Sequence, residues 1–376
     1  MRGIQFITLL CLIVSCGSNV FAWNDLGHMT IARIAYEQLT DGERAAVVSI
    51  LRHHPHLNEV LLKDRPAQVS ASEWIFLRAA TWPDDIRPPR EHTRAPVASH
   101  SLYRFHHAHW HYVNFKYQPG QFDTTLPVHP MPLYPKPSNP SEQTNLIEQL
   151  DQSYLILRGQ ERETSHPEVD LSPHEIRAVR MCWLFHLVGD IHQPLHVVAY
   201  VDPQIPLLKH GDEGGNKLAI RVNHASKPKK LHAVWDDMLG THARYQDVVH
   251  LSERLSHDPR LSVSRLPEYA RHRLATEFAE ESYHVAAEAI YLDGRLPFAL
   301  WPKVESHEIA PESVPAVPQQ WISQAHAIAE RRVVLAGYRL AARLKYIISR
   351  DRSGHESIRN LDSPAFRSQP GNRYVR

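Results

Sequence analysis

Residues 186–196 read HLVGDIHQPLH, and this stretch indicates both the fold and the chemistry of the chain. Apolar residues precede it at helical spacing, so His186 and Asp190 fall on the buried stripe of a helix. A buried imidazole and carboxylate one turn apart lose much solvation, which a mutual hydrogen bond or a bound zinc ion can offset. Pro194 ends or bends the helix and redirects His196 towards the same cavity.

The rest of the chain is also patterned as helix. Ile31, Ala35 and Leu39, for example, share one helical face, whereas strand-like alternation is scarce. Residues 217–222 are the best strand candidate and predict a short β-hairpin. Residues 117–140 are crowded with prolines, which indicates a long irregular loop. We therefore expect a mainly α protein made of a single helical domain.

The domain boundaries follow from composition. The 376 residues are 43% apolar, enough for a substantial core without crosslinks. Candidate site residues lie on both sides of the proline-rich loop, so one domain is expected over residues 23–349. Residues 350–376 are polar, basic and aperiodic, and are expected to form a mobile tail.

The first 22 residues resemble an export signal. Arg2 provides the positive start, an apolar run follows, and a small-residue site predicts cleavage after Ala22. The apolar run is too short to span a membrane, and no second candidate follows, so a secreted or periplasmic protein is expected. The alternative is a lipoprotein anchored at Cys16. Ordinary cleavage leaves Cys182 as the only cysteine, without a disulfide partner.

Net charge and histidine content limit the interpretation. The formal net charge is +1, so a broad positive field typical of many nucleic-acid binders is absent and local cations must hold any phosphate. The chain has 27 histidines, so a single histidine carries little information. We expect solvation or local packing for the following histidines: His53, His54, His56, His106, His107 and His109.

A second histidine–carboxylate pair repeats the helical spacing. His232 and Asp236 are four residues apart, hence on one helix face. Residues 82–87 (WPDDIR) and 110–114 (WHYVN) add a carboxylate, a guanidinium and another imidazole, although each alone is an ordinary surface turn. Cleavage after Ala22 would also place a free amine five residues before a histidine in the segment WNDLGH.

This ordered series resembles the zinc nuclease family of fungi, plants and bacteria, whose best-known members are the S-one and P-one nucleases. The similarity extends to residues 278–283 and 336–341. It implies a helical domain of the phospholipase C and P-one nuclease type, three zinc ions and nine filled ligand positions. The first ion would take Asp84, His111, His186 and Asp190; the second His196, His232 and Asp236; the third the amine and carbonyl of Trp23 with His28 and Asp190.

The resemblance also implies the reaction. Asp190 would bridge two ions that activate a water for attack on phosphorus, and Arg87 would bind phosphate oxygens in the transition state. The products would be 5′-phosphorylated fragments of RNA or single-stranded DNA, with 3′-nucleotidase activity as well. Tyr112 would stack on a base, and Asn114, where specific relatives usually have aspartate, would contact it. His192 and Asp237 are expected to lie behind the ligands or at the surface.

Two other functions remain open at this point. Zinc-dependent phospholipase C shares the expected fold and metal set, but its last ligand is usually glutamate where this chain has Asp236. A non-catalytic zinc-binding surface protein would explain the histidines but not Arg87 and Tyr112. We expect a nucleic-acid or nucleotide substrate, no obligate protein partner and a monomer.

Overall fold

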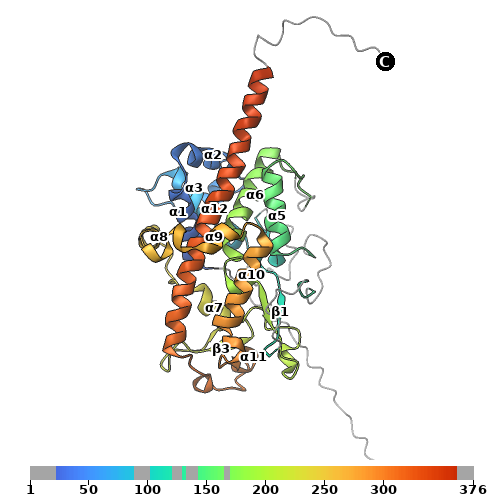
Figure 1. Ribbon diagram of the computed structural model, residues 1–376, viewed down its shortest axis with the longest axis vertical. Helices are drawn as coiled ribbons and strands as arrows, with labels where there is room; N and C mark the ends of the chain where they lie inside the picture. Colours follow the sequence, from blue (N-terminus) through green and yellow to red (C-terminus); the bar gives the residue numbers. More distant parts are fainter. Residues whose placement is uncertain (1–22, 89–101, 121–128, 133–142, 165–169, 362–376) are drawn as a thin grey trace, which may run out of the picture.

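The computed structural model describes residues 23–88, 102–120, 129–132, 143–164 and 170–361, with side chains as far as residue 349. It is mainly helical, as the sequence predicted (Figure 1). The α-helices are α1 (Asp25–Glu37), α2 (Asp41–Leu51), α3 (Ala71–Arg78), α4 (Trp82–Asp85), α5 (Leu146–Leu157), α6 (Pro173–Asp190), α7 (Leu231–Asp236), α8 (Tyr245–Ser256), α9 (Pro267–Arg271), α10 (Ala275–Val285), α11 (Trp301–Glu305) and α12 (Gln319–Leu361).

Helix α6 forms the centre of the molecule. Ser172 caps its first turn in a reciprocal capping box with Glu175, and Pro173 occupies the first helical position, where no N–H is needed. Every residue from Ala178 to Asp190 is buried, because α5, α1, α2, α4 and α12 all pack against this helix. The helix ends at Asp190, shortly before Pro194, so the metal-site stretch begins inside the core.

Helices α1 and α12 make the most extensive helix pair. A Cβ added at Gly337 of α12 would lie 2.6 Å from Cγ2 of Ile34, so the absence of a side chain there lets the two helices approach closely. The far end of α12 projects beyond the other helices in Figure 1. The tail expected from residue 350 is thus helical up to Leu361. No proline interrupts this polar segment.

Two small sheets complete the fold. Strand β3 (Leu218–Ile220) pairs antiparallel with β4 (Lys229–Lys230) and with β5 (Ala299–Leu300), which confirms the hairpin near residue 217. Strand β1 (Phe115–Tyr117) pairs in parallel with β2 (Val198–Tyr200). This second pair was not predicted, since three residues are too few to establish an alternating pattern.

Some sequence predictions fall outside the described residues. These are the export signal at residues 1–22, most of the proline-rich loop, and residues 362–376. Within the described part of the chain, no helix is both long and apolar enough to cross a membrane. Cys182 is buried in α6 as a free thiol.

Candidate metal centre

The chain brings buried histidines and aspartates together from six different elements. They come from α1, α4, α6 and α7 and from two short 3₁₀ turns, η5 (Ala108–His111) and η7 (Pro194–His196). Within each of three groups, one ligand atom per residue lies within 4.8 Å of the others, which is close enough to share a metal ion. The groups are His28, Asp84 and His186; His111, His186 and Asp190; and His196, His232 and Asp236.

The first two groups share His186 and form one continuous cluster. Nε2 of His186 lies 3.2 Å from Oδ2 of Asp190 and 2.9 Å from Nδ1 of His111. Nδ1 of His111 is 3.2 Å from the same carboxylate oxygen, and Oδ1 of Asp84 is 3.9 Å from both ring nitrogens. Two imidazole nitrogens and two carboxylates therefore converge on one small volume.

Three histidines are oriented by backbone carbonyls. Nδ1 of His186 is 2.8 Å from the carbonyl oxygen of Ala80, that of His196 is 2.5 Å from the oxygen of His111, and that of His232 is 2.6 Å from the oxygen of Gly214. Each Nδ1–H can donate to its carbonyl, which turns Nε2 towards the cluster. This is the usual arrangement behind a metal-ligating histidine.

His28 reaches the cluster because α6 has glycine at position 189. Its ring stacks on that of His186 with centroids 4.1 Å apart, and its Nε2 lies 3.4 Å from Oδ1 of Asp190. A Cβ added at Gly189 would lie 2.6 Å from Nδ1 of His28, closer than side chains pack. Gly189 therefore makes the room for His28, a role that helical spacing alone does not reveal.

The third group is completed by a residue that the sequence reading did not identify. Nε2 of His232 lies 3.6 Å from Oδ2 of Asp236, while Nε2 of Gln193 donates to the other oxygen, Oδ1, at 2.8 Å. Oε1 of Gln193 in turn accepts from the backbone N–H of Leu195 at 2.6 Å. Gln193 thus fixes the carboxylate of Asp236 with one oxygen towards His232.

The charges and pKa values of the clustered side chains favour a bound cation. Burial lowers the pKa of His111 to about 4, so its imidazole is neutral near pH 7. Burial also tends to lower the pKa of His186, but Asp190 and Asp84 outweigh it and raise that pKa to about 9. His186 therefore carries a proton beside the two carboxylates, and a bound metal ion would displace it. Burial raises the pKa of Asp236 well above its usual value, as expected for a carboxyl without a nearby cation.

One buried oxygen tests whether these residues fit a metal. Asp190 is fully buried, yet its Oδ1 accepts no hydrogen bond from the described part of the chain. An unsatisfied buried carboxylate oxygen costs on the order of 1–3 kcal/mol, more when charged, unless a cation occupies the site. Histidine nitrogen with carboxylate oxygen is a donor set suited to zinc. The residues fit the metal.

The segment before α1 lies beside the third group. Trp23 is fully buried, and the backbone N–H of Asn24 is 3.5 Å from the carbonyl oxygen of Asp236. The side chain of Asn24 accepts from the N–H of Gly27 and donates to Oδ1 of Asp237 and to the carbonyl of Gly240. Asn24 thus ties the start of the described chain to the end of α7.

Arg87 adjoins the cluster, and the expected substrate residues Tyr112 and Asn114 follow His111 in the chain. Nη2 of Arg87 donates to Oδ1 of Asp84 at 2.6 Å, so the guanidinium adjoins a candidate ligand. Tyr112 and Asn114 are partly exposed. His111 is buried, and its Nδ1 faces Asp190 in the cluster.

Several other histidines serve packing, as expected. His54 and His56 are buried around Trp82, whose Nε1 is 3.3 Å from Nδ1 of His56. His107 stacks on the indole of Trp110 with centroids 3.8 Å apart. These contacts surround the segments that carry Asp84 and His111, and therefore help to fix both.

His192 lies behind the ligands, in a buried network. Its Nδ1 faces the carbonyl of Val188 at 2.7 Å, and Nη1 of Arg339 donates to its Nε2 at 2.7 Å. Arg339 is also bound to Glu281 on α10. Asp237, the other neighbour of a ligand, is nearer the surface and pairs with Lys229 at 3.2 Å.

Comparison with known proteins gives the family. A family described as S1/P1 nuclease matches residues 23–349. Endonuclease 4 of Arabidopsis thaliana is 22% identical over 241 residues, which cover 62% of this chain and 61% of the plant protein. Endonuclease 3 of the same plant is 42% identical over 59 residues, 16% of each chain. The chain therefore matches about three fifths of the length of the first relative.

Proposed function

Since the chain belongs to the S1/P1 nuclease family, we propose that it is a zinc-dependent phosphodiesterase that cuts RNA and single-stranded DNA into 5′-phosphorylated fragments and also removes 3′-phosphates. The observation that carries this proposal is the presence of three histidine–aspartate groups, two of which share His186 near the end of α6. Such a set can hold several cations close together, as hydrolysis of a phosphodiester requires.

We assign the ligands to three zinc ions. The following residues would hold the first: Asp84, His111, His186 and Asp190. His196, His232 and Asp236 would hold the second, with Asp236 fixed by Gln193. Asp190 and His28, with the amine and carbonyl of Trp23, would hold the third. The unsatisfied Oδ1 of Asp190 beside Nε2 of His28 supports this bridging role.

When bound, zinc would lower the pKa of a water and polarise the phosphodiester. The chain's own residues would then orient the substrate. Arg87, beside Asp84, can place two N–H groups on nonbridging phosphate oxygens, where negative charge builds up in the transition state. The partly exposed ring of Tyr112 can stack on a base, and the amide of Asn114 offers a donor and an acceptor to a base edge.

Location and assembly belong to the same proposal. We infer a protein that is secreted or periplasmic after cleavage behind Ala22, and that acts as a monomer without an obligate protein partner. The burial of Trp23 beside the cluster supports a mature chain that starts there.

The decisive experiment compares substrates. The purified protein beginning at Trp23 should cleave RNA and single-stranded DNA faster than double-stranded DNA, and leave phosphatidylcholine intact. It should also contain about three tightly bound zinc ions, measured by elemental analysis. Hydrolysis of phosphatidylcholine without nucleic-acid cleavage would identify a phospholipase C instead. Weak, variable metal binding without hydrolysis would identify a zinc-binding surface protein.

A further inference from the structure

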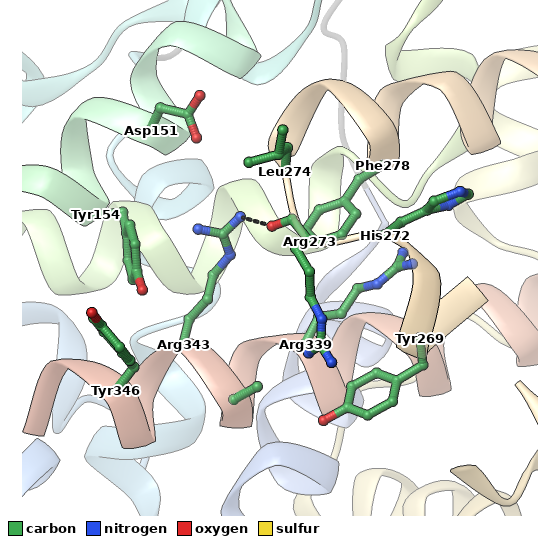
Figure 2. Close-up of a pocket in the computed structure, with 11 residues that line it drawn as sticks. Asp151, Tyr154, Tyr269, His272, Arg273, Leu274, Phe278, Arg339, Arg343 and Tyr346 are labelled. Carbon is green, nitrogen blue, oxygen red and sulfur yellow. Dashed lines mark hydrogen bonds between the residues drawn. The ribbon is translucent and has the colours of Figure 1, made fainter. Parts of the chain in front are cut away.

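A second cavity lies apart from the metal centre. It has a volume of about 330 Å³ and is formed between α5, α10, α12 and the residues that precede α10 (Figure 2). None of the residues that line it is a candidate metal ligand. Phe278 contributes to its wall and also contacts the ring of His192 at 5.3 Å, so the cavity lies behind the buried network that supports the metal-site turn.

Arg343 provides a charge that the protein compensates only weakly. Figure 2 shows its side chain rising from α12 into the cavity. Its one hydrogen bond within the described part of the chain runs from Nη2 to the carbonyl oxygen of Arg273, at 3.3 Å. A guanidinium has five N–H donors, so most have no protein acceptor here. Burial lowers the pKa of Arg343, and Asp151 only partly opposes this effect.

Aromatic faces hold this guanidinium and leave its edge towards the cavity. The Arg343 carbon CZ lies 4.8 Å from the ring centroid of Tyr154 and 5.4 Å from that of Phe278. Arg273 similarly lies 5.6 Å from the ring of Tyr269. An arginine that lies on flat hydrophobic surfaces, as Arg343 does, can bind an anion with several oxygens while the rings accept a planar group.

The remaining features select the kind of anion. Asp151 lies across the cavity from Arg343 and offers acceptor oxygens to an amino group (Figure 2). A cavity of about 330 Å³ is at the small end of ligand sites, so it suits one nucleotide better than a lipid or peptide. Phosphate, planar base and amino group match Arg343, the tyrosines and Asp151, respectively.

We propose that this cavity binds one nucleoside monophosphate unit, with the phosphate on Arg343 and the base against the aromatic rings. The unit is either a free nucleotide or one residue of a nucleic-acid strand, since both present the same chemistry. The choice of a nucleotide rests on the proposed function, whereas the anion-binding character of the cavity rests on its residues alone.

The test uses the zinc-loaded protein and adenosine 5′-monophosphate as probe, followed by titration calorimetry. Arg343→Met should weaken binding at the cavity by about tenfold or more, because a charge-assisted phosphate contact is lost. Turnover of a dinucleotide should stay unchanged. Lys345→Met removes the same charge from an exposed site on α12 outside the cavity, and should bind the nucleotide like the parent protein. Arg343→Gln, which keeps a polar side chain at the same position, serves if Arg343→Met does not fold.

Further arms separate the possible ligands. If Arg343→Met weakens binding of the free nucleotide only, the cavity is a site for free nucleotides. If the substitution also weakens binding of a phosphorothioate-linked oligonucleotide, the cavity holds one residue of a strand. Equal affinity for inorganic phosphate, or unchanged nucleotide binding in both arginine variants, would overturn the proposal. A protein without phosphodiesterase activity would refute the proposed function. The titration would still show whether the cavity binds a nucleotide.

Discussion

At the residue scale, the chemistry concentrates on Asp190, whose two oxygens face different partners. Oδ2 is 3.2 Å from both His111 and His186, whereas Oδ1 is 3.4 Å from His28. A single carboxylate can therefore serve two adjacent cations, and its charge reduces their mutual repulsion. The same burial makes it costly to leave this group without a cation.

We expect Asp190→Asn to abolish phosphodiesterase activity and to release zinc, because a neutral amide cannot offset the repulsion between two cations. Elemental analysis of the purified variant measures the loss. Asp237→Asn is the matched control, since Asp237 neighbours a candidate ligand but bonds to Asn24 and Lys229. Three retained zinc equivalents with near-normal turnover would remove Asp190 from the bridging role.

Arg87 has two possible roles, because it touches Asp84 and adjoins the expected phosphate position. We expect Arg87→Lys to lower turnover on the order of tenfold to a thousandfold with zinc content intact, since the planar two-point phosphate contact is lost. Arg78→Lys changes a comparable pair, Arg78 with Asp85, and should leave turnover nearly normal. Loss of zinc in Arg87→Lys would instead show that Arg87 mainly positions Asp84.

The sequence revealed those site residues that lie one helical turn apart in the chain, and missed others. His186 with Asp190 and His232 with Asp236 were recognisable because one helical turn separates each pair. Gln193 was not, because its bond to Asp236 joins residues 43 apart in the chain. The family resemblance supplied the assignment of Asp84 and His111, which spacing alone could not connect to α6.

At the element scale, α10 and α12 support the metal-site turn from behind. Glu281 of α10 accepts hydrogen bonds from Arg332 and Arg339 of α12, at 2.6 Å for the closest of each. Arg332 also donates to the carbonyl of His192, and Ser282 donates to the carbonyl of Ile191 at 2.5 Å. The network thereby fixes the residues that join Asp190 to His196.

Glu281→Gln should destabilise the protein by about 3 kcal/mol at neutral pH, because two buried arginines lose their counter-charge. Burial tends to raise the pKa of Glu281, but Arg339 and Arg332 outweigh it, so the folded-state pKa lies below the ordinary glutamate value of 4.5. The stabilisation is thus fully present above about pH 4.5 and decreases as the pH falls further.

Denaturant unfolding between pH 3 and 7 measures this effect. The difference in unfolding free energy between parent and Glu281→Gln should shrink steadily below about pH 4.5. Glu280→Gln makes the same change one residue earlier, outside the arginine network, and should show no such dependence. A difference that stays constant with pH would mean that the Glu281 carboxylate does not stabilise the fold through its charge.

Substitution of Gly189 tests whether its missing side chain allows His28 of α1 to reach the cluster. We expect Gly189→Ala to displace His28, because the new Cβ would lie 2.6 Å from its Nδ1. Zinc content should then fall by about one equivalent, while the site at His196 is retained. Gly337→Ala crowds α1 from α12, with its Cβ 2.6 Å from Ile34, and should lower stability by about 1–3 kcal/mol without loss of zinc. Equal zinc loss in both variants would attribute the effect to general packing.

The elements themselves were unequally predictable. The helical spacing of Ile176, Val179 and Trp183 indicated the helix that carries His186 and Asp190, and in α6 every residue from Ala178 to Asp190 is buried. Strands β1 and β2 were missed because the ladder between Phe115 and Val198 exists only once the helices bring the two segments together. Residues 350–361 have no apolar pattern, so the sequence predicted a tail where the structure continues α12 as far as Leu361.

At the scale of the whole molecule, the start of the described chain lies next to the metal centre. Asn24 connects to Asp236, Asp237 and Gly240 near the end of α7, and Trp23 is buried. The segment at Trp23 and Asn24 therefore lies next to Asp236, one of the candidate ligands from the middle of the chain. Cleavage after Ala22, as proposed, would place the new terminal amine beside this cluster.

We therefore expect the mature protein to begin at Trp23, because a free amine is a good zinc ligand and a peptide nitrogen is a poor one. A variant that keeps a few residues before Trp23 should lose about one zinc equivalent and most of its activity. Terminal sequencing of the exported protein locates the cleavage. Cleavage before Cys16, as in a lipoprotein, would leave residues 16–22 ahead of Trp23 and block the amine. Full zinc occupancy and full activity in the extended form would refute the third site, since no terminal amine would then be available beside His28.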